Sequence, residues 1–216
     1  MIDMRILAAA DIHGVLPVYR WLVEQTSLVD VLVVPGDLFD ADFEDQQRLQ
    51  AGEILKILRR SQAPVLYIMG NDDNVLLDYE DVLIKPLHGR RVEMGDCNFV
   101  GYQYTPPFLG ESFVKEDAEI AHDLASFESL VDERTVLVTH TPAFGSLDLC
   151  DSGNAGSRGL NDFLVRKPVL AHIHGHIHHC FGVDGYHFNV ASAATCRAMM
   201  IDLPSLKYEV ISSTAK

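Results

Sequence analysis

Seven side chains able to bind metal ions follow apolar, strand-like runs in this sequence. They are Asp, Asn and His residues without a thiolate, a donor set that suits hard or borderline divalent ions. In chain order they are Asp11, His13, Asp37, Asn71, His140, His176 and His178. Two divalent ions held side by side by such donors can hydrolyse a phosphoester, so the pattern predicts a dinuclear metal hydrolase.

The strands that precede these residues are expected to bring them together. Apolar runs that read as buried strands lie at residues 5–10, 31–34, 65–69 and 135–139. Ligands of an open α/β sheet bind in the crevice outside the carboxyl ends of its strands, where these side chains would meet. In the His-rich segment an extended backbone can aim His176 and His178 the same way, and Gly175 would let that backbone approach an ion.

Strand and helix signals alternate through the first part of the chain. Helices are predicted at residues 16–26, 44–60, 116–131 and 158–165, and further strands at 91–93, 98–102 and 168–173. The helix at 44–60 has an acidic start and a basic end, which complement its macrodipole. Alternating units of this kind require right-handed crossovers and give a mostly parallel sheet covered by helices.

The C-terminal part changes to hairpin signals. Asp184-Gly185 separates strand-like runs at 180–183 and 186–190, and a two-residue Asp-Gly connection favours a type I′ turn. Runs at 199–203 and 206–211 suggest a second hairpin. These antiparallel strands indicate a second, mixed sheet packed on the first.

Length and composition indicate one globular unit. The 216 residues fit a single domain over 1–216, with 48% hydrophobic and 22% charged residues and no linker-like segment. The longest apolar runs are too short to span a membrane, and the N-terminal apolar stretch meets Asp11 too early for a signal peptide. We therefore expect a cytoplasmic protein. A free edge of the second sheet would permit a homo-oligomer.

Charge and cysteine usage exclude other classes. The formal net charge of −14 would repel a nucleic-acid backbone, and the sequence has no basic stripe. The four cysteines are scattered without a C-x-x-C pair, so they resemble reduced structural thiols more than a disulfide frame or a zinc ribbon.

The ordered set of motifs resembles one known family. D-x-H at Asp11, G-D at Asp37, G-N-D at Asn71, a lone His140 and G-H-x-H ending at His178 resemble the calcineurin-like metallophosphoesterases. The resemblance implies an α/β fold, a four-layer α/β/β/α sandwich with two mixed sheets. It also implies hydrolysis of a small phosphomonoester or phosphodiester by a metal-activated hydroxide.

The same resemblance distributes the ligands between two ions. It assigns Asp11, His13 and His178 to one ion and Asn71, His140 and His176 to the other, with Asp37 as the bridging carboxylate. Manganese is the ion that the family suggests; iron, zinc, magnesium and nickel are compatible with the same mixed donors.

Three further residues are candidates for catalysis. Many family members carry His directly after the Gly-Asn pair, where this chain has Asp72. An Asp beside dications should stay ionised and is a poor proton donor. We therefore expect esters with acidic leaving groups to react well and simple alkyl monoesters slowly. Arg158, at a predicted helix start with free backbone N–H groups, could bind a substrate phosphate, and His174 could support a ligand or contact the substrate.

Other functions of the same fold stay open at this point. A non-catalytic metal-binding scaffold or protein-interaction module would not require all seven ligands. A protein Ser/Thr phosphatase would normally carry Arg before the Gly-Asn pair, where this chain has Met69.

Overall fold

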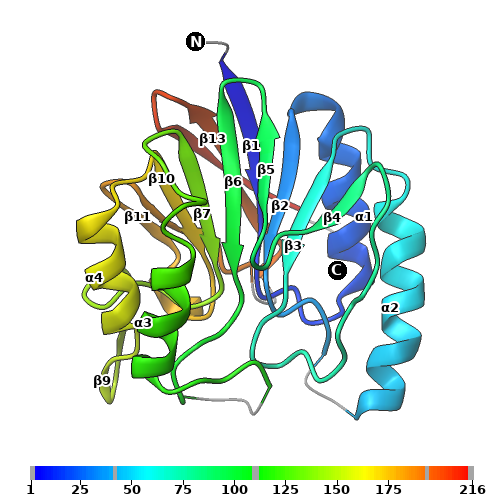
Figure 1. Cartoon of the computed structure of the whole chain (residues 1–216). Helices are drawn as coiled ribbons and strands as arrows, with labels where there is room; N and C mark the ends of the chain where they lie inside the picture. The colour runs from blue at the N-terminus through cyan, green and yellow to red at the C-terminus, as the bar shows by residue number, and fades with distance from the viewer. Residues whose placement is uncertain (1–2, 41–42, 109–111, 193–194, 214–216) are drawn as a thin grey trace.

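Two six-stranded sheets face each other in the centre of the molecule, and helices cover their outer sides (Figure 1). This arrangement comes from a computed structural model that describes residues 3–40, 43–108, 112–192 and 195–213. Both sheets mix parallel and antiparallel pairs, which confirms the predicted α/β architecture with two mixed sheets.

The first sheet has the strand order β14-β13-β1-β2-β3-β4. Its strands are β1 (Met4–Ala8), β2 (Val31–Pro35), β3 (Val65–Ile68), β4 (Ile84–Pro86), β13 (Arg197–Leu203) and β14 (Lys207–Ser212). The strands β1 to β4 run parallel, and β13 pairs antiparallel with both β1 and β14. The helices α1 (Leu16–Gln25) and α2 (Glu44–Leu58) cross over between the first strands, and a 3-10 turn, Thr26–Leu28, follows α1.

The second sheet has the order β11-β12-β10-β7-β6-β5. Its strands are β5 (Arg91–Met94), β6 (Cys97–Tyr102), β7 (Thr135–Thr139), β10 (Ala171–His174), β11 (Gly182–Asp184) and β12 (His187–Asn189). The helices α3 (Asp117–Ser126) and α4 (Arg158–Arg166) pack on each other at its outer side (Figure 1). A small hairpin of β8 (Leu149–Cys150) and β9 (Gly153–Asn154) and a 3-10 turn, His178–Cys180, lie near the site described below.

Alternate residues of the central strands pack into different layers. In β1, Ile6 and Ala8 belong to the core between the sheets, whereas Leu7 packs in the core beneath α1 and α2. A third core lies between the second sheet and α3 and α4. Because both faces of such strands are buried, they read in the sequence as continuous apolar runs.

The structure corrects the sequence prediction at the C-terminus. The hairpin β13–β14 does not belong to the second sheet; it extends the first sheet beside β1. Both faces of β13 are buried, because Met199 faces the core between the sheets and Ala198 the core beneath the helices. The helix predicted at 116–131 ends earlier, at Ser126.

Short elements were also absent from the prediction. The strand β4 and the hairpin β8–β9 have only two or three residues each, too few for a periodic pattern. No helix in the described part of the chain is long and apolar enough to cross a membrane.

A directed series of hydrogen bonds crosses the outer face of the second sheet. The Thr139 hydroxyl donates to the Thr141 carbonyl, so its oxygen accepts the 2.8 Å hydrogen bond from His172 Nε2. The other ring nitrogen of His172 must then accept from His187 Nδ1, 2.9 Å away. Burial, with the neighbouring His174 and His187, lowers the pKa of His172 well below its ordinary value. These bonds therefore hold a neutral imidazole.

Acid should weaken the fold through His172. Because its pKa is lowered on folding, the unfolded chain binds a proton at His172 below pH ~6.5 that the native protein does not bind. The unfolding free energy of the wild type minus that of His172→Asn should therefore decrease as the pH is lowered from 6.5 to 5, by up to ~1.4 kcal/mol per pH unit. Urea denaturation of the metal-free proteins across this range measures it, and a constant difference would contradict the expectation.

Candidate metal centre

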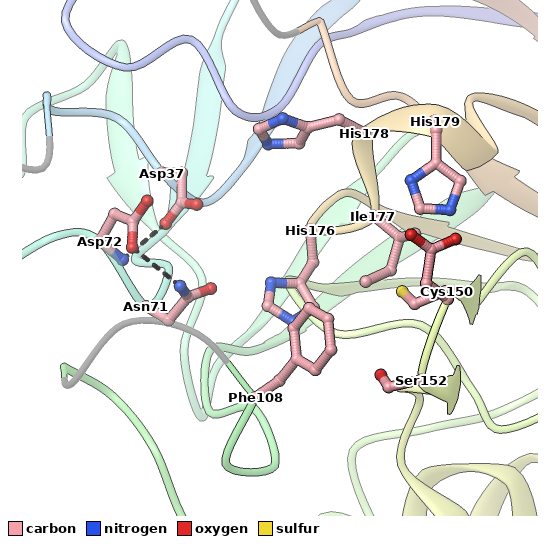
Figure 2. Close-up of a pocket in the computed structure, with 11 residues that line it drawn as sticks. Asp37, Asn71, Asp72, Phe108, Cys150, Ser152, His176, Ile177, His178 and His179 are labelled. Atoms are coloured by element: carbon pink, nitrogen blue, oxygen red, sulfur yellow. Dashed lines mark hydrogen bonds between the residues drawn. The ribbon is translucent and has the colours of Figure 1, made fainter.

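All seven predicted ligands lie at one end of the sandwich, in the turns that follow β1, β2, β3, β7 and β10. Asp11, Asp37, Asn71, His140 and His176 are buried, His13 is partly buried, and His178 is exposed. Four of them, Asp37, Asn71, His176 and His178, line a cavity of about 630 Å³ (Figure 2). The spatial convergence expected from the strand ends is thus present.

Asp11, His13 and His178 form one group of donors. His178 Nε2 lies 3.2 Å from Asp11 Oδ1 and 3.4 Å from His13 Nε2. One ligand atom from each of the three lies within 4.8 Å of the others. Asp11 also accepts the backbone N–H of His176 with both carboxylate oxygens at 3.1 Å, which ties the turn after β10 to the turn after β1.

Asp37, Asn71 and His140 meet on the other side. His140 Nε2 lies 2.9 Å from Asn71 Oδ1 and 3.3 Å from Asp37 Oδ2, while its Nδ1 donates to the Pro35 carbonyl at 2.8 Å. Holding Nδ1–H on a carbonyl aims Nε2 at Asn71 and Asp37, and metal-binding imidazoles are commonly oriented by such a bond. The ligand atoms of Asp37 also group with Asp11 and with His13, so Asp37 stands between the two sets.

The buried side chains of Asp37 and His140 each shift the pKa of the other. Burial alone would lower the pKa of His140, but the Asp37 charge and hydrogen bond raise it to about 10. Burial likewise would raise the pKa of Asp37, and His140 outweighs it and holds that pKa below its ordinary value. Without a cation, a proton on His140 therefore balances the buried carboxylate.

His176 offers a free, neutral nitrogen. Its Nε2 is buried with no hydrogen-bond partner among the described residues, and its ring lies 5.1 Å from that of His140. Burial, followed by the His140 charge, lowers its pKa to about 4, so the lone pair is available at neutral pH. Buried polar atoms are nearly always satisfied, and a cation would satisfy this one. These residues, with their N and O donors, fit divalent metal binding.

Backbone strain gathers at the same residues. Asp11, His13, Asp37 and His176 all have positive φ, between 49° and 71°. Such conformations cost roughly 1–3 kcal/mol each for residues other than glycine and cluster at functional sites. Nothing in the sequence pattern revealed this strain, because the residue types do not favour that conformation strongly enough to predict it.

Glycines beside the ligands provide room for their neighbours. A Cβ added to Gly70 would overlap the Asp37 carboxylate, and one added to Gly175 would overlap the Asp11 carboxylate. Each of these two glycines therefore leaves room for a carboxylate ligand carried by a different turn.

Gln47 joins two segments near the candidate site, a contact that the sequence did not reveal. This fully buried side chain of α2 donates to the Asp40 and Asp72 carbonyls, both at 2.7 Å. Its oxygen accepts the backbone N–H groups of Asn74 and Val75 at 2.7 and 3.1 Å. Gln47 thus connects the segment after β2 to the segment that carries Asn71. A single polar residue on a helix gives no signal of this kind in a sequence.

The three predicted catalytic residues lie at different places relative to the cavity. Asp72 lines the cavity, whereas Arg158 and His174 are not among the residues that line it. The Arg158 guanidinium lies 3.6 Å from the Phe144 ring centroid. His174 is fully buried behind the cavity, stacked on His172.

The backbone N–H groups beside Arg158 that were expected to bind a phosphate donate to other groups of the protein. The backbone N–H groups of Gly156, Ser157 and Gly159 donate to Asp148, the Pro142 carbonyl and Asp117 respectively. These donors are therefore not free, and the geometry gives Arg158 no role at the cavity.

Comparisons with known proteins agree with this geometry. The sequence profile of the calcineurin-like phosphoesterase family matches residues 4–180. No curated protein gives a significant match. The solved structure of TT1561 from Thermus thermophilus superposes with a TM-score of 0.74 at 15% identity, over 98% of this chain and 99% of that one.

Two larger proteins contain the same fold. The purple acid phosphatase of yellow lupin seeds superposes with a TM-score of 0.62 at 12% identity, over 100% of this chain and 52% of that one. The NAD nucleotidase of Haemophilus influenzae superposes at 0.54 and 10% identity, over 97% and 49%. At these identities the likeness concerns the fold alone.

Because the family profile covers most of the chain, the protein belongs to the calcineurin-like phosphoesterase family. It is therefore a hydrolase of phosphoester bonds, in a family that uses divalent metals, and it carries a cluster of residues able to bind such ions.

Removing the Gln47 side chain should destabilise the protein strongly. Gln47→Ala removes the side-chain partner of two backbone carbonyls and two backbone N–H groups, which should lower the unfolding free energy by about 2–4 kcal/mol. Gln46→Ala is the matched control, because Gln46 is exposed on the same helix and its loss should change stability by less than about 0.5 kcal/mol. Urea denaturation compares the two variants, and equal stabilities would exclude the bridging role of Gln47.

Proposed function

We propose that this protein hydrolyses a small phosphomonoester or phosphodiester with the aid of two divalent ions. The observation that carries the proposal is the pairing of two donor groups about Asp37, with Asp11, His13 and His178 on one side and Asn71 and His140 on the other. His176, whose Nε2 is unpartnered among the described residues, supplies the further donor on the second side. When bound, two such ions supply an activated water and stabilise charge in the in-line transition state.

The charges of the protein suit an anionic substrate. Asp11 and Asp37 are the two carboxylates of the proposed ligand set, so two divalent ions would leave about two positive charges. Asn71 contributes a neutral oxygen and cancels none of that charge. The cavity can therefore attract a phosphoryl group although the chain is acidic, with a net charge of −14.

Asp72 orients a ligand in this proposal and does not donate a proton. Its Oδ1 accepts from Asn71 Nδ2 at 2.9 Å, which turns the amide oxygen of Asn71 toward His140 and the cavity (Figure 2). Its backbone N–H also donates to Asp37 Oδ1 at 2.9 Å. Burial, then the Asp37 charge, raises the pKa of Asp72, whereas nearby dications act in the opposite direction. We expect the carboxylate form, which accepts hydrogen bonds only.

Manganese is the ion that we propose first, by family resemblance, and iron, zinc, magnesium or nickel would suit the same donors. A single domain over residues 1–216, a cytoplasmic location, a homo-oligomer and the absence of nucleic-acid partners stay predictions.

Removal of metal should abolish activity. Chelated protein should hydrolyse a nitrophenyl phosphate or diester at background rate, and titration with Mn²⁺ should restore turnover in step with two ions per chain. Asp37→Asn should lower the restored rate at least ~100-fold, because even residues that only support metal ligands matter 10–100-fold. Elemental analysis with parallel rate measurements tests both points. Full activity at one ion per chain would contradict the dinuclear site.

The leaving group should limit the rate on alkyl esters. The wild type should favour aryl over simple alkyl esters, because Asp72 cannot protonate a basic alkoxide. Asp72→His should raise the ratio of alkyl to aryl rates by about 10-fold or more, since a positioned acid contributes at least that much. Asp72→Asn, which keeps an acceptor toward Asn71, is the control and should leave the ratio unchanged. Equal wild-type rates on both ester classes would refute the prediction.

A further inference from the structure

We propose that the substrate of this site carries one phosphoryl group and an uncharged, planar aromatic leaving group that stacks on Phe108. The proposal rests on the phosphoester hydrolysis proposed above and names the substrate class for the same cavity. Its evidence is the size of the cavity, the apolar character of one wall and the distribution of charge along the lining.

The cavity is much larger than a phosphoryl group needs. Its volume is about 630 Å³, in the range of pockets that enclose whole organic ligands and far above the ~30 Å³ share of one water molecule. Of the eleven described residues that line it, four are proposed metal ligands: Asp37, Asn71, His176 and His178. The rest of the space must therefore receive the organic part of the substrate.

The side away from the metal ligands contains an apolar wall. Cys150 and Ile177 lie there, with Ser152 and His179 beside them, and Phe108 lies next to His176 (Figure 2). Phe108 is 37% exposed, so its ring surface is accessible in the substrate-free protein. Its ring contacts His176 edge to face, with 5.6 Å between centroids. Phe108 therefore stands where the donor side meets the apolar wall, next to the place where a leaving group would depart.

The lining provides no cation for a second anionic group. Among the eleven described residues that line the cavity none is Lys or Arg, whereas Asp72 and Asp151 contribute negative charge. Two arginines, Arg158 at the start of α4 and Arg197 at the start of β13, have other partners. Arg158 stacks on Phe144, and Arg197 donates to the His178 carbonyl at 2.9 Å and covers the Phe181 ring. A carboxylate or second phosphate on the leaving group would therefore be desolvated without compensation.

An aromatic ring fits these conditions better than a sugar or an alkyl chain. Stacked or edge-to-face aromatic pairs add about 0.5–1.5 kcal/mol beyond the area they bury. A polyhydroxylated group could bond to Asp151, Ser152 and His179 but would gain nothing from the Phe108 ring, whereas a planar ring can stack on it. An aryl leaving group is also the kind that departs without a proton donor, in agreement with Asp72 at its position.

Phosphonates test the stacking without turnover. Calorimetric titration of the manganese-loaded protein with phenylphosphonate and with methylphosphonate gives the contribution of the ring. We expect Phe108→Ala to weaken phenylphosphonate about fivefold to tenfold and to leave methylphosphonate within twofold. Phe108→Tyr should retain the wild-type affinities. Phe43→Ala, which removes a Phe that is 79% exposed and outside the cavity lining, is the matched control and should change neither.

A second phosphonate tests whether the site rejects a further negative charge on the leaving group. A 3-carboxyphenylphosphonate should bind the wild type at least tenfold more weakly than phenylphosphonate, and an equal or higher affinity would overturn the single-anion requirement. If Phe108→Ala weakens both phosphonates equally, Phe108 supports His176 and the stacking proposal fails.

The same measurements distinguish a failure of the proposed hydrolysis from a failure of the aromatic substrate class. If methylphosphonate does not bind the metal-loaded wild type and no phosphoester is turned over, the proposed hydrolysis itself fails. If methylphosphonate binds and phosphoesters react, but the Phe108 variants do not discriminate the ring, only the aromatic substrate class is overturned.

Discussion

The contact between the Asp37 carboxylate and the His140 imidazole governs how this end of the molecule is built. Both groups are buried, and each shifts the other's pKa against the effect of burial. A buried charge of either sign alone would be costly, so the pair requires a proton or a cation between carboxylate and imidazole. The other donors surround this pair, and the His176 nitrogen, unpartnered among the described residues, makes the same demand for a cation.

The fold supplies the candidate ligands from segments that are far apart in the sequence. Parallel strands end at one edge, so each turn delivers one or two donors, and the turn backbones adopt left-handed conformations to aim them. Glycines admit the carboxylates of adjacent turns, and Asp11 accepts the His176 N–H across two sheets. Gln47 then holds two of the turns from the helical layer. Strain at the site is thus opposed by hydrogen bonds that come from outside it.

Asp72 stands where many family members carry His, and this difference bears on which leaving groups the site can accept. A carboxylate at this place accepts from Asn71 and orients its amide, but it offers no proton to a leaving group. The cavity agrees with that restriction, because its apolar wall and the lack of lining cations among the described residues suit a leaving group that is stable as an anion and carries no further charge. In the proposed function, Asp72 therefore connects the geometry of the ligand Asn71 with the preference for such substrates.

The alternation of strands and helices, the convergence of the seven candidate ligands and the family could all be predicted from the amino-acid sequence. Those features depend on local patterning and on motif order, which a single chain displays directly. The same patterning assigned β13–β14 to the wrong sheet, because apolar alternation cannot say which strand edge a hairpin joins. Three-dimensional contacts were needed to establish that Arg158 stacks on Phe144 and that His174 is fully buried. They also show that Gln47 bonds to two separate segments and that Phe108 lines the cavity. Each of these outcomes depends on contacts between segments far apart in the chain, and such contacts leave no periodic trace in the sequence.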